Sequence, residues 1–351
     1  MTGPLAQPRS DNACMPHGGM RPAAARCSAA WMAALMLATA STPAPAQQAW
    51  RPERPVENVV ASAAGGAGDA NARLFQTIVQ KYRLVDVPII IANKAGGGQA
   101  VALNYLDQHV GDGHYVMNST MGLMTAHIMG RSKVTYTDYT TLAILYGEYM
   151  TLAVKPDSPL KNARDVMERL RRDPQSLSFA IGLAIGGTNH ISVGLITKAM
   201  GVDVRKLKTV VFQTNAQGIT AIMGGHVDVA SLSLAIALRA AKQGQVRIIG
   251  ISSERRTEGA AADIPTWREQ GLDVVFSNMR FAIGPKGLGA APTAYWDGVF
   301  ERLIQTEEWK NEVRLNDWVP DYSGSKQAPA RMAKLNGQLK AALADAGLVQ
   351  E

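Results

Sequence analysis

The stretch VVASAAGGAGDANARLF, Val59–Phe75, joins a strand-like apolar run, a glycine turn and the start of a helical pattern. Because glycine tolerates tight turns, such a unit places the amino end of a helix directly after a strand. Unpaired N–H groups and the positive end of the helix dipole gather there, which favours an anion site. The same unit is also a common connector, so the stretch alone leaves a purely structural role open.

The remaining pattern predicts an α/β fold. Val56–Ser62 is predicted as a buried strand and Ala70–Tyr82 as an amphipathic helix, and strand and helix patterns then alternate along the chain. This alternation predicts a mostly parallel sheet with helices on both faces. Two extended crossings, near Gly147–Thr151 and near Phe276–Arg280, are expected to join two α/β units.

The first 46 residues have the pattern of a secretory signal peptide. Arg21 and Arg26 precede the apolar run Ala29–Ala40, which is too short to span a bilayer. Ala44 and Ala46 then form an A-x-A cleavage site, so the mature protein is expected to begin at or near Gln47 and to be exported to the periplasm.

Composition narrows the function of the mature chain. Both cysteines, Cys14 and Cys27, lie in the predicted signal peptide, so we expect no disulfide and no thiol chemistry. The formal net charge of +7 falls to about +5 without that peptide, and the basic residues are scattered. Such a charge suits a small acidic ligand, and without a basic stripe we expect no nucleic-acid partner.

Small polar residues follow four of the predicted strands. In open α/β sheets, ligands bind at the carboxyl ends of the strands. The loops concerned are Gly65–Gly68, Ser119–Thr120, Gly186–Asn189 and Gln213–Asn215. Three of these loops open helices, with Asp69, Asn189, and Thr214 or Asn215 as expected N-caps.

Several other kinds of site are excluded by spacing. Gly66 and Gly68 match the start of a dinucleotide fingerprint, but Asn71 stands where the third glycine is needed, and the sequence has no P-loop and no nucleophile elbow. The histidines lack zinc-site spacing, so neither a metal nor a cofactor is predicted. His190, in the third loop, is open to two interpretations: a general base, or a residue that packs or hydrogen-bonds near a ligand.

The segments AAGGAGDANAR, GDGHYVMNST, MGGHVDV and IPTWREQGLDV occur in the order in which the Bug/TctC family has them. The chain resembles this family, the periplasmic solute-binding proteins of tripartite tricarboxylate transporters, from about Val56 to Leu348. The resemblance implies a two-lobed type II periplasmic-binding-protein architecture with a ligand cleft between the lobes. Lobe 1 is then expected to comprise residues 47–149 and 278–351, and lobe 2 residues 150–277.

The resemblance also implies a carboxylate ligand held by loop N–H groups and small hydroxyls. Transferred by motif, the expected ligand-binding residues are Ala64, Gly65, Gly66, Asp69, Ser119, Thr120, Gly187, Thr188, Asn189, His190, Thr214 and Asn215. The sequence departs from the family at Phe212 and Gln213, where a tyrosine and a basic residue are frequent, and at Met279, where many members have an aromatic residue.

Arg280, beside the second crossing, is a further candidate. A guanidinium can clamp a carboxylate through two parallel hydrogen bonds. The alternative is that Arg280 pairs with an acid of its own lobe.

The predicted function is therefore a periplasmic receptor that binds a small organic carboxylate and delivers it to membrane permease subunits. We expect no enzymatic activity. Two alternatives stay open: a secreted hydrolase or isomerase acting on a carboxylate, and a sensory receptor that presents its ligand to a membrane kinase.

Overall fold

The computed structural model describes residues 50–65, 67–182 and 184–349, and the predicted signal peptide and Gly66 lie outside these ranges. The strands are β1 (Val56–Val60), β2 (Ile89–Asn93), β3 (Tyr115–Thr120), β4 (Thr140–Val154), β5 (Ser178–Gly182), β6 (Lys208–Phe212), β7 (Val229–Ser233), β8 (Arg247–Ile251), β9 (Ser277–Gly284) and β10 (Trp318–Gly324). The α-helices are α2 (Ala67–Lys81), α3 (Ala100–Leu106), α4 (Gly122–Ile128), α5 (Ala163–Arg172), α6 (Thr188–Ala199), α7 (Asn215–Met223), α8 (Leu234–Lys242), α9 (Ala290–Gln305), α10 (Glu307–Leu315) and α11 (Ala328–Asp345). Short 3-10 helices are η1 (Gly97–Gln99), η2 (Asp107–His109), η3 (Tyr136–Asp138), η4 (Val204–Lys206) and η5 (Gly259–Ala261).

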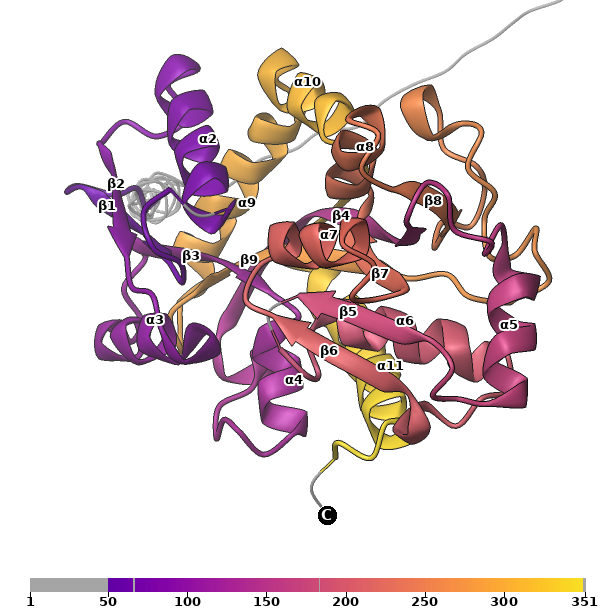
Figure 1. Ribbon diagram of the computed structural model, residues 1–351. Coiled ribbons are helices and arrows are strands. Elements are labelled where there is room, and N and C mark those ends of the chain that lie inside the picture. Colours follow the sequence, from indigo (N-terminus) through magenta and orange to yellow (C-terminus); the bar gives the residue numbers. More distant parts are fainter. Residues whose placement is uncertain (1–49, 66, 183, 350–351) are drawn as a thin grey trace, which may run out of the picture. The chain divides into compact units, whose positions relative to one another are not determined.

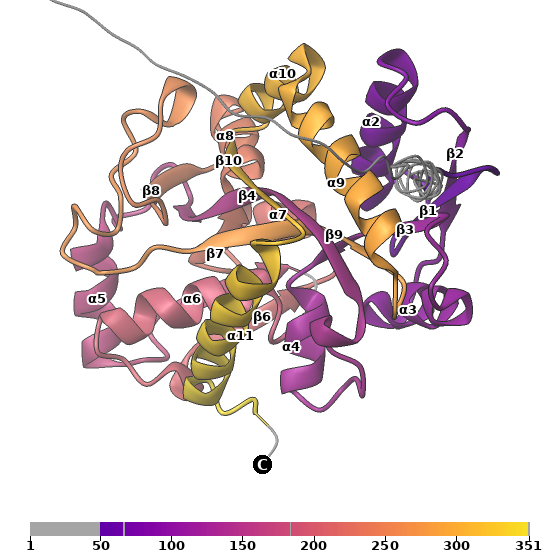
Figure 2. The ribbon, with the colours of Figure 1, turned by 180° about the vertical axis from the view of Figure 1, so that it is seen from behind.

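The strands form one mixed sheet in the order β2-β1-β3-β9-β4-β7-β5-β6 (Figure 1). Strands β8 and β10 also pair with β4, and β10 is labelled in Figure 2. Strand β1 is parallel to β2 and β3, and β5 is parallel to β6 and β7. Strand β9 is antiparallel to β3 and β4, and β4 is antiparallel to β7, β8 and β10. The prediction of a mostly parallel sheet is therefore wrong, because the two strands at its centre, β9 and β4, introduce antiparallel pairs.

Strand β4 passes through both halves of the sheet. Its residues Thr140–Tyr149 pair with β9 and β10, whereas Met150–Val154 pair with β7 and β8. We call β1, β2, β3, β9, β10 and Thr140–Tyr149 the first sheet half, and the remaining strands with Met150–Val154 the second sheet half. The segment predicted as the first extended crossing lies inside this unbroken strand.

Helix α11 packs against both halves of the fold. Figure 2 shows it between α4 and α6, and it contacts both helices. Its buried residues Met332, Leu335 and Leu339 belong to one core cluster with Met124 of α4 and Ile191 of α6. Burial of such side chains, each worth roughly 1.5–3 kcal/mol relative to exposure, holds the C-terminal segment against the rest of the chain. Within the described ranges, no helix combines the length and apolar character that crossing a membrane requires.

The core of the second sheet half contains a tight contact between β8 and an indole. Trp267 is fully buried, and a Cβ added at Gly250 would lie 2.4 Å from an atom of its ring. Because protein interiors are close-packed, this contact leaves no room for a methyl group. A glycine at position 250 is therefore required by packing.

We expect Gly250→Ala to lower the free energy of unfolding by about 1–3 kcal/mol, because the methyl group displaces a buried ring. Gly298→Ala is the matched control: it lies inside α9, and nothing lies within 4 Å of its added Cβ. That change should raise stability by about 0.5–1 kcal/mol, since alanine is the better helix former. Urea unfolding of both variants measures the difference, and equal effects would contradict the packing argument.

Candidate functional site

The four predicted loops lie at strand ends that the sheet brings together in pairs. Strands β1 and β3 are parallel neighbours, with Val60 opposite Asn118 at their carboxyl ends. Strands β5 and β6 end together, with Gly182 opposite Phe212. The first two loops therefore follow one edge of the first sheet half, and the other two follow one edge of the second. We call the residues of these loops, with the side chains bonded to them, the candidate site.

Asp69 organises the first loop. It is the third residue of α2 and not its N-cap, which corrects the prediction. Its side chain is 3% exposed, and it accepts hydrogen bonds from Arg73 Nε (2.8 Å), the Gly65 N–H (3.0 Å) and Asn93 Nδ2 (3.0 Å). These donors, Arg73 first, lower the pKa of Asp69 to about 2. The carboxylate is thus satisfied by its own surroundings and fixes the turn.

The same contact limits what the first loop can offer a ligand. Ala64 and Gly65 form an exposed turn in which Gly65 has a φ of 81°, a conformation suited to glycine. The Gly65 N–H is already engaged by Asp69, and Gly66 lies outside the described residues. Ala64 therefore stays an expectation on motif alone, and any anion contact made by Gly65 would have to share its donor.

A glutamine that the sequence reasoning missed closes the second loop. Gln99 accepts from Ser119 Oγ (2.9 Å) and donates to Thr120 Oγ1 (3.1 Å). Its φ is 87°, which is uncommon for a residue with a side chain. Ser119 is buried, and Thr120 Oγ1 also accepts from the Gly122 N–H at 3.2 Å. The two hydroxyls therefore have protein partners, and a strained backbone positions the residue that bridges them.

Arg280 lies next to the second loop because β9 runs antiparallel to β3. The register places Thr120 opposite Arg280, and Arg280 opposite Tyr146 of β4. Arg280 donates to Glu148 Oε2 from Nη2 (2.7 Å) and Nε (3.1 Å), and Asn278 Nδ2 donates to the same oxygen at 2.8 Å. The side chains of Arg280 and Glu148 are 26% and 15% exposed, and although burial lowers the pKa of Arg280, the Glu148 carboxylate raises it overall. The alternative in which Arg280 pairs with an acid is thus the arrangement present here, and Glu148 is that acid.

Asn278 extends this network to the third loop. Thr188 Oγ1 donates to Asn278 Oδ1 at 3.3 Å, which links the start of α6 to β9. The chain of contacts Thr188–Asn278–Glu148–Arg280 therefore connects the second sheet half with the first. Neither Glu148 nor Asn278 was a predicted site residue.

The third loop presents a helix amino end. Gly187 is the N-cap of α6, so the helix begins at Thr188, and the predicted N-cap Asn189 is instead a helical residue. Within the described residues, the first-turn N–H groups of Thr188, Asn189 and His190 have no hydrogen-bond acceptor. Such N–H groups, with the helix dipole behind them, suit a carboxylate or phosphate.

His190 braces the same loop. Its Nδ1 accepts from the Gly186 N–H at 3.1 Å, and burial lowers the pKa of the imidazole. A neutral ring with Nδ1 accepting carries its proton on Nε2. The contacts in the described residues include no carboxylate beside this ring, so its arrangement is that of a loop support.

The fourth loop is held mainly by internal bonds. Of the two predicted N-caps of α7, Thr214 is the one observed, and Asn215 is the first helical residue. Thr214 forms a capping box with Gln217. Asn189 Nδ2 donates to the Ser231 carbonyl and, at 3.4 Å, to Asn215 Oδ1. The structure thus joins the third and fourth loops through two asparagines.

Within the described residues, no group of three or more His, Cys, Asp and Glu side chains has the arrangement of a metal site.

The likeness to solved structures identifies the class of fold. MatC from Rhodopseudomonas palustris with bound malate superposes with a TM-score of 0.67 at 23% identity, over 85% of this chain and all of MatC. A second R. palustris protein, solved with adipate, superposes with a TM-score of 0.73 at 19% identity, over 85% of this chain and 99% of that protein. A TctC solute-binding protein from Polaromonas superposes with a TM-score of 0.70 at 21% identity, over 83% of this chain and 98% of that protein. The fold is that of the two-lobed periplasmic binding proteins.

The family follows from the sequence comparison. The family described as "Tripartite tricarboxylate transporter family receptor", TctC, matches residues 73–303. A "UPF0065 protein in gbd 5'region" of Cupriavidus necator is 23% identical over 317 residues, covering 90% of this chain and 94% of that protein. This chain therefore belongs to the TctC family of solute-binding receptors.

Asp69 gives the candidate site a testable pH dependence. Its pKa of about 2 lies below the ordinary 3.8, so its contribution to stability is complete above pH 3.8 and is lost as the pH falls through about 2. Asp69→Asn should therefore be less stable than the natural protein at neutral pH. This gap, the difference in the free energy of unfolding, should narrow as the pH falls from 3.8 to about 2. Urea unfolding across this pH range measures the gap. Asp263→Asn, at an exposed acid, is the control, and a gap that does not change with pH would contradict the assignment.

Proposed function

We propose that this protein is a periplasmic receptor that binds a small organic carboxylate and delivers it to the membrane permease subunits of a tripartite transporter. The observation that carries the proposal is the pairing of two anion donors across the sheet. The first-turn N–H groups of α6, which have no acceptor among the residues that the structure describes, stand at one end of the Thr188–Asn278–Glu148–Arg280 network. Arg280 stands at the other end. Family membership and the malate and adipate of two similar structures support a carboxylate.

Within this proposal, the first sheet half belongs to lobe 1, residues 47–149 and 278–351. The second sheet half belongs to lobe 2, residues 150–277. Strand β4 and the start of β9 connect them, so these segments are the proposed hinges. A ligand that contacts loops of both lobes would favour the closed state by its differential affinity for that state. The Thr188–Asn278 hydrogen bond, at 3.3 Å, is a contact that such a motion would make or break.

Periplasmic location is proposed from the signal-peptide pattern of residues 1–46 and from the family. The binding role is preferred to catalysis because His190 Nδ1 accepts a loop N–H and the pKa of the ring is lowered by burial. A general base needs a free nitrogen within reach of the substrate and a pKa near the operating pH. The tight internal bonding of Asp69 likewise disfavours an acid–base role for that group.

We expect the mature protein to bind one small carboxylate per chain and to release it unchanged. Calorimetry against malate, adipate, citrate and benzoate, together with mass spectrometry of any compound that co-purifies from the periplasm, tests this. Chemical conversion of a bound carboxylate over many turnovers would contradict the receptor function. A failure of all carboxylates, with a different compound co-purifying, would contradict the ligand class alone.

We expect Arg280→Ala to weaken carboxylate binding by about 2–5 kcal/mol, or roughly 30-fold to several thousand-fold, if Arg280 anchors the ligand. Because the change also leaves Glu148 without its cation, the free protein should lose about 1–3 kcal/mol of stability as well. Glu148→Gln is the matched variant: it removes the charge that neutralises Arg280 and should leave carboxylate affinity equal or higher. Calorimetry and thermal unfolding of both variants separate the effects. A change in affinity below about fivefold in Arg280→Ala would mean that Arg280 is not the anchor.

A further inference from the structure

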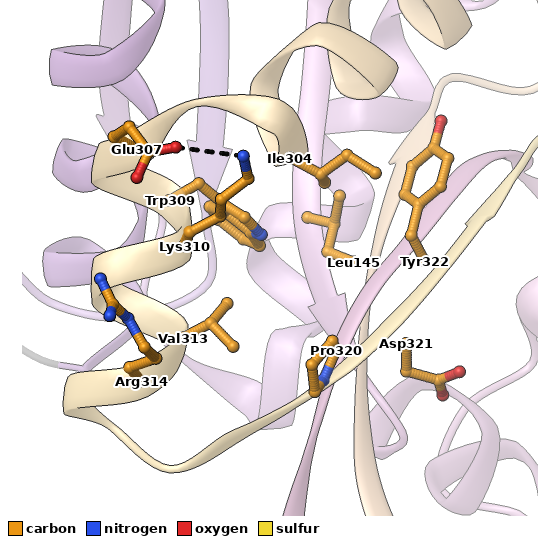
Figure 3. A pocket seen from close by; sticks show the side chains of 10 residues that line it. All are labelled: Leu145, Ile304, Glu307, Trp309, Lys310, Val313, Arg314, Pro320, Asp321 and Tyr322. Carbon is orange, nitrogen blue, oxygen red and sulfur yellow. Dashed lines mark hydrogen bonds and ion pairs between the residues drawn. The ribbon is translucent and has the colours of Figure 1, made fainter.

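A cavity of about 610 Å³ lies between α10 and β10. Figure 3 shows its apolar floor between the helix and the strand, with charged side chains around the rim. None of its lining residues belongs to the candidate site. The side chains that form the floor are Leu145, Ile304, Trp309, Val313, Pro320 and Tyr322.

The size and the floor suit a small molecule with an apolar body. Binding sites for small ligands have volumes of roughly 300–1,000 Å³ and are lined mainly by apolar and aromatic side chains. The indole of Trp309 lies against Tyr146 and Trp318, with ring centroids 5.8 and 6.0 Å away, so the floor rests on a packed aromatic cluster. A cavity over such a floor is preformed, which keeps the cost of binding low.

The rim selects for a negative group. Lys310 pairs with Glu307 at 3.1 Å, and Asp321 accepts two hydrogen bonds from Arg331 at 2.6 and 2.7 Å. Arg314 hydrogen-bonds the amide of Asn311 and forms no ion pair with a carboxylate in the part of the chain that the structure describes. Both acids of the rim are thus matched, and one cation remains in excess.

We propose that this α10–β10 cavity is a second binding site, which takes an amphipathic monoanion: an unbranched or aromatic apolar body inside, and a carboxylate at the rim near Lys310 and Arg314. The apolar body fills the floor between Trp309, Val313 and Pro320. The site is separate from the proposed receptor site, and neither proposal requires the other.

Octanoate is the probe, because its chain is apolar and its head is a carboxylate. Calorimetry on the mature protein should show saturable binding at one site, with a dissociation constant of about 1 mM or lower. Hexanoate should bind about 10-fold or more weakly, since each buried methylene contributes about fourfold. Octylammonium, of the same length and opposite charge, should bind up to about fivefold more weakly than octanoate, because an exposed charge contributes up to about that factor.

Two pairs of variants locate the site. Val313→Trp places an indole in the floor and should weaken octanoate binding at least tenfold. Leu315→Trp introduces the same indole at a 75% exposed position of α10 and should not weaken it. Arg314→Glu changes an exposed side chain without disturbing the core and should weaken octanoate binding about fivefold or more. Arg255→Glu, at an exposed arginine elsewhere, should not weaken it. Arg280→Ala should leave octanoate binding unchanged.

The outcomes decide the proposal even if Val313→Trp fails to fold, since Arg314→Glu and the probe series do not depend on it. If octanoate binding were lost in Arg280→Ala and retained in Arg314→Glu, octanoate would bind in the proposed receptor site. That result would overturn the proposal of a second site. Equal affinity for octanoate and octylammonium would overturn the charge selection. No saturable binding of octanoate would overturn the proposal.

Discussion

The pairing of β4 with β9 is the constraint on which the rest of the structure depends. Strand β4 contributes residues to both sheet halves, and β9 runs beside it in the opposite direction. Because antiparallel partners face each other residue by residue, this pairing fixes Arg280 beside Tyr146 and Asn278 beside Glu148. A slip of one residue would turn every one of these side chains to the opposite face of the sheet. The polar network of the candidate site is therefore a consequence of sheet register.

The electrostatics of the candidate site follow from that register. Glu148 is the one charged residue of a strand that is otherwise apolar or polar, and burial of a carboxylate is costly unless donors satisfy it. Oε2 has three such hydrogen bonds, from Arg280 and Asn278. Asp69 and Arg73 form a second matched pair. A site built from matched pairs has little net charge, so the N–H groups of the loops become important for attracting an anion.

Much of the local structure followed from the sequence, because its causes are local. The glycine turn of the first loop and the Thr214 cap depend on neighbouring residues, and both formed as the pattern indicated. The antiparallel pairing of β9 with β3 and β4 depends on partners far away in the chain, and the prediction of a mostly parallel sheet was wrong for that reason. Glu148 was missed for the same reason: an isolated acid in an apolar run has no motif, and its partners Asn278 and Arg280 lie 130 and 132 residues further on. Gln99 was missed because its role depends on a left-handed backbone that no neighbouring residue type announces.

The aromatic cluster of Tyr146, Trp309 and Trp318 connects α10 and β10 to β4. Tyr146 stacks on Trp318 of β10 at 3.9 Å between centroids and meets the edge of Trp309, while its hydroxyl accepts from Asn71 of α2 at 2.9 Å. Its register partner is Arg280. One side chain therefore contacts the floor of the α10–β10 cavity, helix α2 behind the first loop, and the strand that carries the candidate anchor. Because protein interiors are close-packed, a displacement of α10 against β10 would act on the Tyr146 ring, which contacts Trp309 and Trp318. Tyr146 is therefore a shared neighbour of the α10–β10 cavity floor and of Arg280, and the connection between these two parts of the fold is made by packing and not by solvent-exposed charges.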